Sequence, residues 1–278
     1  MSHATVSTIP TLDPYRIAPD TWVIPEPIPT PVGFSSINSM VIVGREPIVV
    51  DTGMAINRER FFQKVGAIVD PRDVRWIFLS HDDTDHSGNL LAMLEAAPNA
   101  TLVTNWFAVE RMSADFELPV ERLRWVNNGE SFDAGDRTLL AIRPPTFDGP
   151  TTRGLFDTKT GAYWAVDCFG ALMPSPTTDA ADVPADMYEE GFLAVHRLIS
   201  PWHHMLDTAK FNRLVDQVRA LPIKSIGSAH GPALFGDMVQ TGFDLLRRLP
   251  EMENFAEPTQ AVLEQLQAAA QSELLVAA

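Results

Sequence analysis

Residues 81–86, with the sequence His-Asp-Asp-Thr-Asp-His, place five side chains that can bind a metal ion within six positions. They follow an apolar run at 74–79 that predicts a buried strand, and they precede an expected helix at 88–97. Imidazole and carboxylate groups together suit Fe, Zn or Mn. The alternative is an Asp-rich helix start with solvated histidines. That alternative explains neither the two histidines nor the buried strand, so the turn predicts a metal site, with enough ligands for two ions.

Three further side chains follow predicted strands and are candidates for the same site. Asp167 and His230 each follow a short apolar run, and Asp148 lies a few residues after another. Each alone has a simpler explanation, since an Asp after a strand often forms a turn and a histidine before Gly-Pro is often only a loop residue. The order of these residues along the chain is therefore more informative than any one of them.

The composition is that of a globular α/β protein. The chain has 278 residues, of which 45% are hydrophobic, and a formal net charge of -15. Such an acidic chain is poorly suited to nucleic acid or an anionic membrane. Its single cysteine, Cys168, excludes an internal disulfide and fits the cytoplasm. No apolar run approaches the ~18 residues of a membrane span, and residues 1–31 lack the pattern of a signal peptide.

Hydrophobic periodicity predicts a mixture of strands and helices along the chain. Strands are expected at 21–24, 39–43, 47–50, 74–79, 101–104, 123–126, 137–142, 154–156, 162–166 and 224–227. Helices are expected at 58–69, 88–97, 106–116, 182–199, 208–221, 238–249 and 259–275. The polar, proline-containing segment 1–20 predicts a loose arm. No linker rich in Gly and Ser divides residues 21–278, so we expect a single domain with C-terminal helices, built from two sheets covered by helices.

The series of motifs resembles the metallo-β-lactamase superfamily over roughly residues 20–250. The series consists of Asp-Thr-Gly at 51–53, the cluster at 81–86, Asp167, and His-Gly-Pro at 230–232. The resemblance implies an α/β fold, the metallo-β-lactamase αβ/βα sandwich, in which two mixed β-sheets flanked by helices hold a dinuclear site at one edge.

Within that superfamily the chain is more similar to the flavodiiron and oxygen-binding diiron branch. Asp83 stands where most hydrolases of the superfamily have histidine and where this branch has a carboxylate, usually glutamate. The stretches Asp-His-Ser-Gly at 85–88 and Asp-x-Phe-Gly at 167–170 are also similar to that branch. Two features depart from it. Asp-Gly-Pro at 148–150 stands where the branch has a histidine two residues before a proline, and no flavodoxin-like domain follows.

The resemblance implies three imidazole and four carboxylate ligands in two half-sites. The first half-site would hold His81, Asp83 and Asp148, the second would hold Asp85, His86 and His230, and Asp167 would bridge them. Either Asp148 replaces the usual imidazole or that ligand is lost. Four negative charges balance two divalent ions, and the oxygen-rich first half-site favours Fe, with Zn or Mn as alternatives. No catalytic residue beyond these ligands and no flavin site is predicted.

Side chains near the ligands have weaker assignments. Asp51 ends a neighbouring strand and is a candidate hydrogen-bond partner for a ligand histidine, although Asp in Asp-Thr-Gly can also be a turn residue. Cys168 is expected to point away from the site. His203 and His204 are expected to be ordinary loop histidines.

Three functions remain open at this point. The first is an oxidoreductase that binds or activates O2 or NO, or oxidises a small substrate, with electrons from a separate donor. The second is a hydrolase in which a metal-bound hydroxide attacks an ester, lactone, thioester or phosphoester. The third is a sensor whose metals only bind a gas. The carboxylate at Asp83 favours the first, and the resemblance also implies a homodimer.

Overall fold

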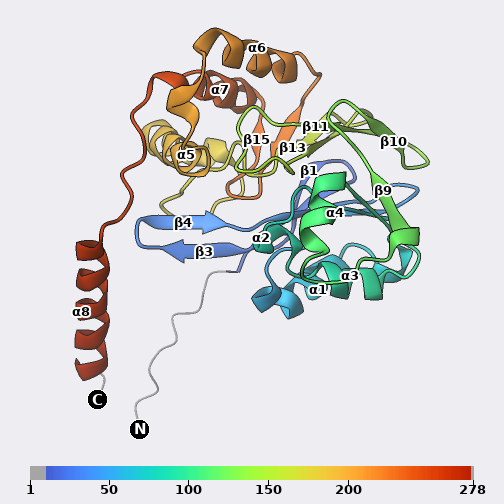
Figure 1. The fold of residues 1–278 in the computed structure, drawn as a ribbon, viewed down its shortest axis with the longest axis horizontal. Coiled ribbons are helices and arrows are strands. Elements are labelled where there is room, and N and C mark those ends of the chain that lie inside the picture. Colours follow the sequence, from blue (N-terminus) through green and yellow to red (C-terminus); the bar gives the residue numbers. More distant parts are fainter. Residues whose placement is uncertain (1–10, 277–278) are drawn as a thin grey trace.

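Two β-sheets packed face to face form the centre of the molecule, and helices cover the outer face of each sheet (Figure 1). The computed structural model of the chain describes residues 11–276. Each sheet contains both parallel and antiparallel neighbours. The predicted αβ/βα sandwich of two mixed sheets flanked by helices is therefore confirmed.

The strands divide among three sheets. The first has the order β1 (Tyr15–Ala18), β2 (Thr21–Ile24), β5 (Ser39–Ile42), β6 (Ile48–Val50), β7 (Trp76–Phe78), β8 (Thr101–Thr104), β9 (Leu123–Trp125). The second has the order β10 (Ser131–Asp133), β11 (Thr138–Ile142), β12 (Gly154–Asp157), β13 (Ala162–Trp164), β14 (Ser225–Gly227), β15 (Leu234–Phe235). A separate hairpin consists of β3 (Pro27–Thr30) and β4 (Gly33–Ser36).

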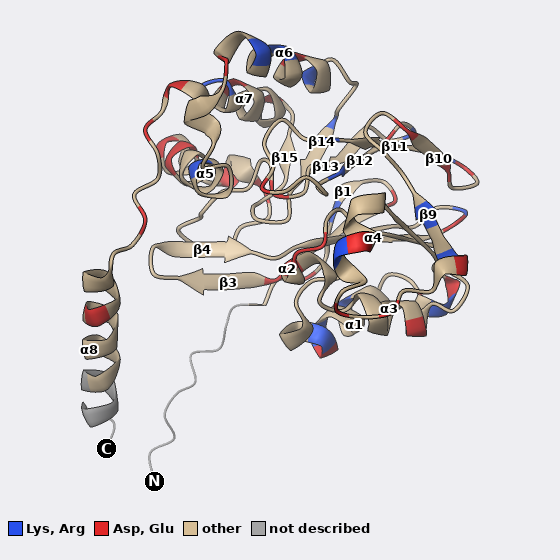
Figure 2. Ribbon diagram, viewed as in Figure 1, with Lys and Arg blue, Asp and Glu red and all other residues tan. Residues whose placement is uncertain are grey.

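Six of the described helices form two groups of three, one on each side of the sandwich. The described α-helices are α1 (Arg58–Gly66), α2 (Thr84–Ser87), α3 (Leu90–Ala96), α4 (Trp106–Met112), α5 (Ala185–Ile199), α6 (Thr208–Arg219), α7 (Asp237–Leu246) and α8 (Gln260–Val276). Helices α1, α3 and α4 pack on the first sheet, and α5, α6 and α7 pack on the second. Among the described helices, none is both long and apolar enough to cross a bilayer. Figure 2 shows acidic residues on elements of both layers, in keeping with the net charge of -15.

Alternation along the strands supplies apolar side chains to both faces of each sheet. In β12, Leu155 faces the first sheet whereas Phe156 faces the helices. Strands buried on both faces read as continuous apolar runs, which is why the sequence predicted most of them. The strands β6, β7, β13 and β14 end at the same edge of the sandwich, and the loops that follow them carry the candidate site.

Two parts of the chain differ from the prediction. The loose arm proposed for residues 1–20 includes β1, which pairs with β2 through Tyr15 opposite Val23 and extends the first sheet; residues 1–10 lie outside the described part of the chain. The helix expected at 88–97 is present as α3 (Leu90–Ala96), and an additional helical turn, α2, begins at Thr84 inside the cluster 81–86, after the extended Asp83. The Ser87 hydroxyl supports this turn by donating to the Asp83 carbonyl at 2.9 Å.

A buried arginine joins the two sheets and gives a stability prediction. Arg137 is 5% exposed and contacts the carboxylates of Asp20, Asp136 and Asp157, the last at 2.8 Å. We expect Arg137→Met to lower the free energy of unfolding by about 3–5 kcal/mol, because it leaves the buried Asp157 without its cation. Urea denaturation measures this loss. The exposed Arg72, paired with Asp70, is the control, and an equal loss in Arg72→Met would contradict the argument.

Candidate metal centre

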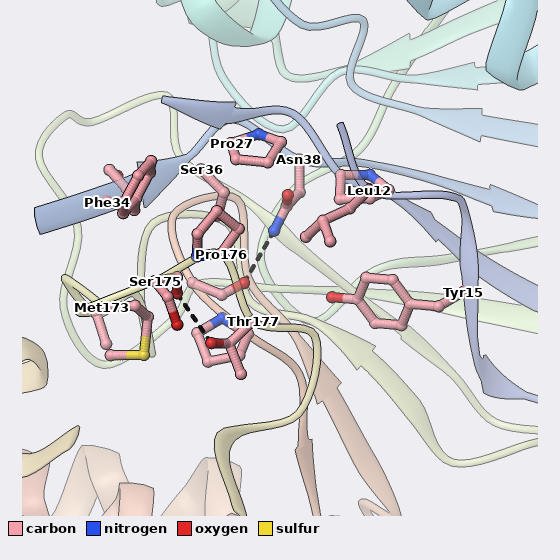
Figure 3. A pocket seen from close by; sticks show the side chains of 15 residues that line it. Leu12, Tyr15, Pro27, Phe34, Ser36, Asn38, Met173, Ser175, Pro176 and Thr177 are labelled. Atoms are coloured by element: carbon pink, nitrogen blue, oxygen red, sulfur yellow. Dashed lines mark hydrogen bonds between the residues drawn. The ribbon is translucent and has the colours of Figure 1, made fainter. Parts of the chain in front are cut away.

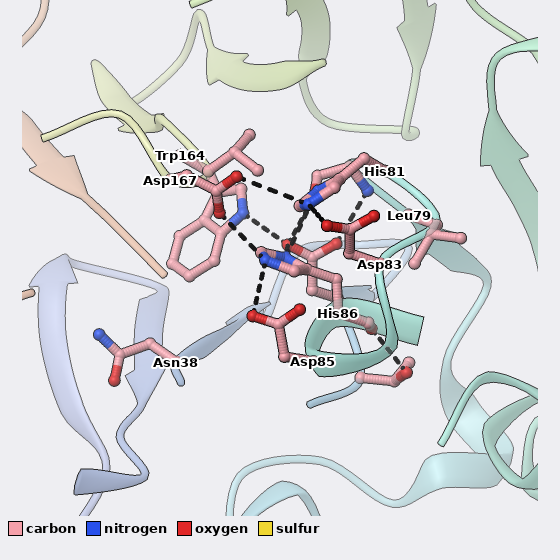
Figure 4. Close-up of polar contacts among 12 residues, drawn as sticks. Asn38, Leu79, His81, Asp83, Asp85, His86, Trp164 and Asp167 are labelled. Carbon is pink, nitrogen blue, oxygen red and sulfur yellow. Dashed lines mark hydrogen bonds and ion pairs between the residues drawn. The ribbon is translucent and has the colours of Figure 1, made fainter. Parts of the chain in front are cut away.

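The seven side chains predicted as ligands lie together at the edge where the four strands end. These residues are His81, Asp83, Asp85, His86, Asp148, Asp167 and His230. Figure 4 shows five of them, His81, Asp83, Asp85, His86 and Asp167. Their ligand atoms form three overlapping groups, each with all atoms within 4.8 Å of one another. The predicted juxtaposition is confirmed, whereas the binding of metal by these residues stays a prediction.

The first group surrounds His81. Its Nε2 atom lies 3.8 Å from Asp83 Oδ2, 3.7 Å from Asp148 Oδ2 and 3.5 Å from Asp167 Oδ2. The Asp83 and Asp148 side chains are 47% and 28% exposed, so this group opens to solvent. Asp148 points into the site, and its other oxygen accepts a hydrogen bond from the Thr152 hydroxyl at 3.1 Å.

The second group is more deeply buried. Asp85 Oδ2 lies 3.4 Å from the Nε2 atoms of both His86 and His230. Asp167 Oδ1 lies 3.1 Å from His86 Nε2 and 3.0 Å from His230 Nε2. The two oxygens of Asp167 therefore face different groups, which is the arrangement a bridging carboxylate requires.

All three histidines turn Nε2 toward the centre because a second hydrogen bond holds Nδ1. The Nδ1 partners are the Ser80 hydroxyl for His81 at 3.1 Å, the Asp51 carboxylate for His86 at 3.0 Å and the Ser36 carbonyl for His230 at 2.9 Å. Such partners fix the ring orientation and the tautomer of histidines that bind metals. The expectation that Asp51 supports a ligand histidine is confirmed as a contact.

The Asp51 carboxylate forms hydrogen bonds with several side chains around the site. Its carboxylate is fully buried and accepts hydrogen bonds from the Ser80 amide and hydroxyl, both at 2.8 Å, and from Trp164 Nε1 at 2.9 Å. Its backbone has a φ of 56°, an uncommon conformation for a residue other than glycine. Neither Ser80 nor Trp164 was predicted as a partner of Asp51. Ser80 follows β7, which pairs with β6, and the packing of the second sheet on the first brings Trp164 of β13 to Asp51.

We expect Asp51→Asn to weaken metal binding by about 10–100-fold while the fold is retained, because loss of such a hydrogen-bond partner has this effect at metal sites. The amide keeps the shape of the carboxylate but removes the charge that faces His86 Nδ1. Competition with a chelator measures the affinity, and circular dichroism controls for folding. An unchanged affinity would show that Asp51 only shapes the turn.

The loop that carries Asp167 is held in an unusual backbone conformation. Val166 and Phe169, on either side of the Asp167-Cys168 pair, have φ values of 61° and 65°. Deep burial lowers the pKa of His196 to about 4, so this side chain is neutral and its Nε2 accepts a hydrogen bond from the Phe169 amide at 2.9 Å. A Cβ on Gly170 would lie 3.0 Å from His230 Cβ, so glycine permits the two ligand loops to approach.

The charges in the cluster fit a cation at its centre. Burial would lower the pKa of His86, but the carboxylates of Asp167 and Asp51 outweigh it and raise this pKa. Burial raises the pKa of Asp83, and the nearby Asp148 raises it further. His86 Nε2 and Asp167 Oδ1 are buried without a hydrogen-bond partner, although they face each other. Buried polar atoms of this kind usually have a partner, and two metal ions would supply it.

Asp82 is the acidic residue of the segment 81–86 that was not predicted as a ligand. Asp82 points away from the centre, accepts a hydrogen bond from the Thr151 hydroxyl at 2.8 Å and pairs with Arg111 at 2.7 Å. Asn105 also donates to the Thr151 carbonyl. These contacts fasten the segment that carries Asp148 to the turn at 81–86.

Other polar groups near the centre behave as expected. Cys168 is buried beside the Thr146 hydroxyl, and burial raises the pKa of its thiol to about 12, so it is unreactive. His203 is bound to the Leu249 carbonyl, and His204 is exposed.

A cavity beside the His230 turn, next to Asn38, has a volume of about 20 Å³ (Figure 3), which is room for a single water and not for a substrate.

Comparison with known proteins agrees with this geometry. Residues 34–231 match the family described as ODP family beta lactamase, and this range contains all seven candidate ligands. The chain belongs to that family. Its predicted resemblance to metallo-β-lactamase domains of the diiron branch is therefore confirmed.

Relatives of this ODP-family chain include flavoproteins. A candidate diflavin flavoprotein of Nostoc sp. is 26% identical over 204 residues, which cover 72% of this chain and 34% of that protein. An anaerobic nitric oxide reductase flavorubredoxin of Vibrio vulnificus is 23% identical over 199 residues, covering 71% of this chain and 40% of that protein. The chain thus spans about a third to two fifths of the length of these relatives.

Solved structures share the fold. Rubredoxin oxygen:oxidoreductase of Desulfovibrio gigas has a TM-score of 0.76 and 17% identity, covering 87% of this chain and 62% of that one. The flavodiiron protein of Giardia intestinalis has a TM-score of 0.75 and 18% identity, covering 87% of this chain and 60% of that one. At these identities the likeness concerns the fold.

Proposed function

We propose that this chain is a diiron oxidoreductase that binds and reduces a small oxidant such as O2 or NO. The observation that carries the proposal is the position of Asp167, whose two oxygens face two separate groups of imidazoles and carboxylates. The names of relatives and of similar structures include a nitric oxide reductase and an oxygen:oxidoreductase. They favour the redox alternative over the hydrolytic one.

The seven candidate ligands would bind one metal ion in each of the two half-sites. His81, Asp83 and Asp148 would hold the first metal ion, and Asp85, His86 and His230 would hold the second, with Asp167 between them. Two iron ions bound there would supply the redox chemistry, because iron changes its oxidation state whereas Zn²⁺ does not. Four carboxylates would balance two divalent charges, so the filled site would carry little net charge.

The protein would control access through differences in burial. The His86 side chain is 1% exposed, whereas the Asp83 side chain is 47% exposed. A small oxidant would therefore approach from the side of Asp83 and Asp148. The hydrogen bonds of Asp51 and Ser80 would keep the imidazoles oriented while the charge at the centre changes.

Electrons would come from a separate redox protein, since relatives of this chain carry the names diflavin flavoprotein and flavorubredoxin. The homodimer implied by the family resemblance stays a prediction, and sedimentation of the purified chain measures it.

The test of this proposal uses iron-loaded protein with a chemical reductant under anaerobic conditions, followed by a known amount of O2 or NO. We expect catalytic consumption of the oxidant that disappears in His230→Ala. The exposed His204→Ala is the matched control and should retain the activity. Hydrolysis of ester or thioester substrates by the fully iron-loaded protein, without consumption of either oxidant, would contradict the proposal.

A further inference from the structure

Two arginines without acidic partners lie at either end of the segment that carries Asp148. Arg153 is 8% exposed, and its Nη1 atom donates to the carbonyls of Pro150 at 3.1 Å and Thr152 at 2.7 Å. Arg143 Nη2 donates to the same Pro150 carbonyl at 3.0 Å. The Nε atoms of both arginines are buried and have no hydrogen-bond partner.

Arg153 differs in its partners from Arg137, the other arginine that is buried in the described part of the chain. Arg137 is surrounded by three carboxylates, whereas Arg143 and Arg153 form no ion pair with any acidic side chain that the structure describes. Burial and the neighbouring Arg143 lower the pKa of Arg153 to about 10. An unpaired buried cation is costly, and it is unexpected in a protein with a net charge of -15. A bound anion would supply the missing negative charge and accept from the free N–H groups.

An apolar cavity adjoins Arg143, which lies next to Arg153. It has a volume of about 490 Å³ and lies between the end of β11 and helix α6. Its wall includes Arg143 and the apolar side chains of Leu140, Ile142, Phe147, Val218 and Leu221. The Arg143 guanidinium lies 5.2 Å from the centre of the Phe147 ring, so its positive charge is located next to an aromatic side chain that lines the cavity. A mostly apolar cavity of this size with few polar groups is typical of small-molecule sites.

We propose that Arg143 and this cavity bind a small amphipathic carboxylate. Its carboxylate would accept hydrogen bonds from Arg143, next to the second unpaired charge of Arg153, and its apolar body would lie between β11 and α6. The apolar wall favours such a molecule over inorganic phosphate, which has no apolar body to bury. The site requires no metal ion and is independent of the redox function proposed above.

Calorimetric titration of the full chain with decanoate tests this proposal, with decanol and inorganic phosphate as probes of the tail and the head alone. We expect saturable binding of one decanoate per chain and at least about 10-fold weaker binding of either other probe, since hydrogen bonds to charged groups contribute this much. Arg143→Met should weaken decanoate binding by a similar factor, and Arg153→Met should weaken it less, because Arg153 does not line the cavity. Arg219 lies on helix α6, which lines the cavity, but it is paired with Asp244. Arg219→Met should therefore leave decanoate binding unchanged.

A second variant keeps the test decisive if loss of Arg153 disturbs folding. Leu214 lines the cavity and is 52% exposed, so Leu214→Trp should fill the space while both arginines remain. We expect this variant to lose decanoate binding and to keep the circular dichroism of the parent. The proposal is overturned if decanoate does not bind, if phosphate binds equally well, or if decanoate binding persists in Leu214→Trp and Arg143→Met.

Discussion

Replacing Asp85 or His230 with alanine is expected to abolish oxidant reduction and to leave at most one metal ion per chain. Both residues belong to the more buried group, in which Asp85 Oδ2 lies 3.4 Å from His230 Nε2. Loss of a supporting hydrogen bond already costs about 10–100-fold in metal affinity, so loss of a ligand should cost more than about 100-fold. Removing Asp85 also leaves the Nε2 atoms of the two imidazoles of this group facing a single carboxylate, that of Asp167.

Metal analysis and activity, measured on the same preparations, check this expectation. Asp115→Ala and His204→Ala are matched controls, because both residues are exposed and lie outside the cluster. The controls should keep two ions and full activity. Full occupancy in Asp85→Ala or His230→Ala would show that the ligand assignment is wrong.

Asp148→Ala is expected to empty the first half-site before the second, which reduces the metal content to about one ion per chain. Asp148 Oδ2 lies 3.7 Å from His81 Nε2, and the remaining carboxylates of that group are Asp83 and the shared Asp167. Asp148→His should have the opposite effect on affinity. It supplies a second imidazole, which should tighten binding there and shift the preference toward softer ions.

Stepwise metal titration of the two Asp148 variants separates these outcomes. If Asp148 merely ends its turn and interacts with Thr152, the alanine variant will bind two ions as tightly as the parent. Thr152→Val is the companion variant, because it removes the hydrogen bond to Asp148 without removing the carboxylate. It should weaken the first half-site less than Asp148→Ala does.

The ligand positions could be predicted because metal chemistry restricts residue types and the chain gathers them locally. Four of the seven candidates lie within residues 81–86. The others follow strands, and the ends of β13 and β14 meet that turn because the two sheets pack face to face. The resemblance to a known family predicted which group each of Asp148, Asp167 and His230 joins, and the structure places them in those groups.

The residues that support the ligands could not be predicted in the same way. Asn38 donates to the Ser228 and Gly231 carbonyls and fixes the His230 turn, yet these partners are some 190 positions apart. Trp164 looks like an ordinary core residue in the sequence. Partners set by the packing of two sheets leave no local pattern, and the four-residue strand β1 is too short to stand out from the segment that was predicted as an arm.

Metal content and the visible spectrum, recorded on protein purified without chelator, decide whether this chain is a diiron protein. We expect two iron ions per chain and a charge-transfer absorption that bleaches on reduction and returns on addition of O2. A colourless protein with two zinc ions, unchanged by reductant and O2, would contradict it.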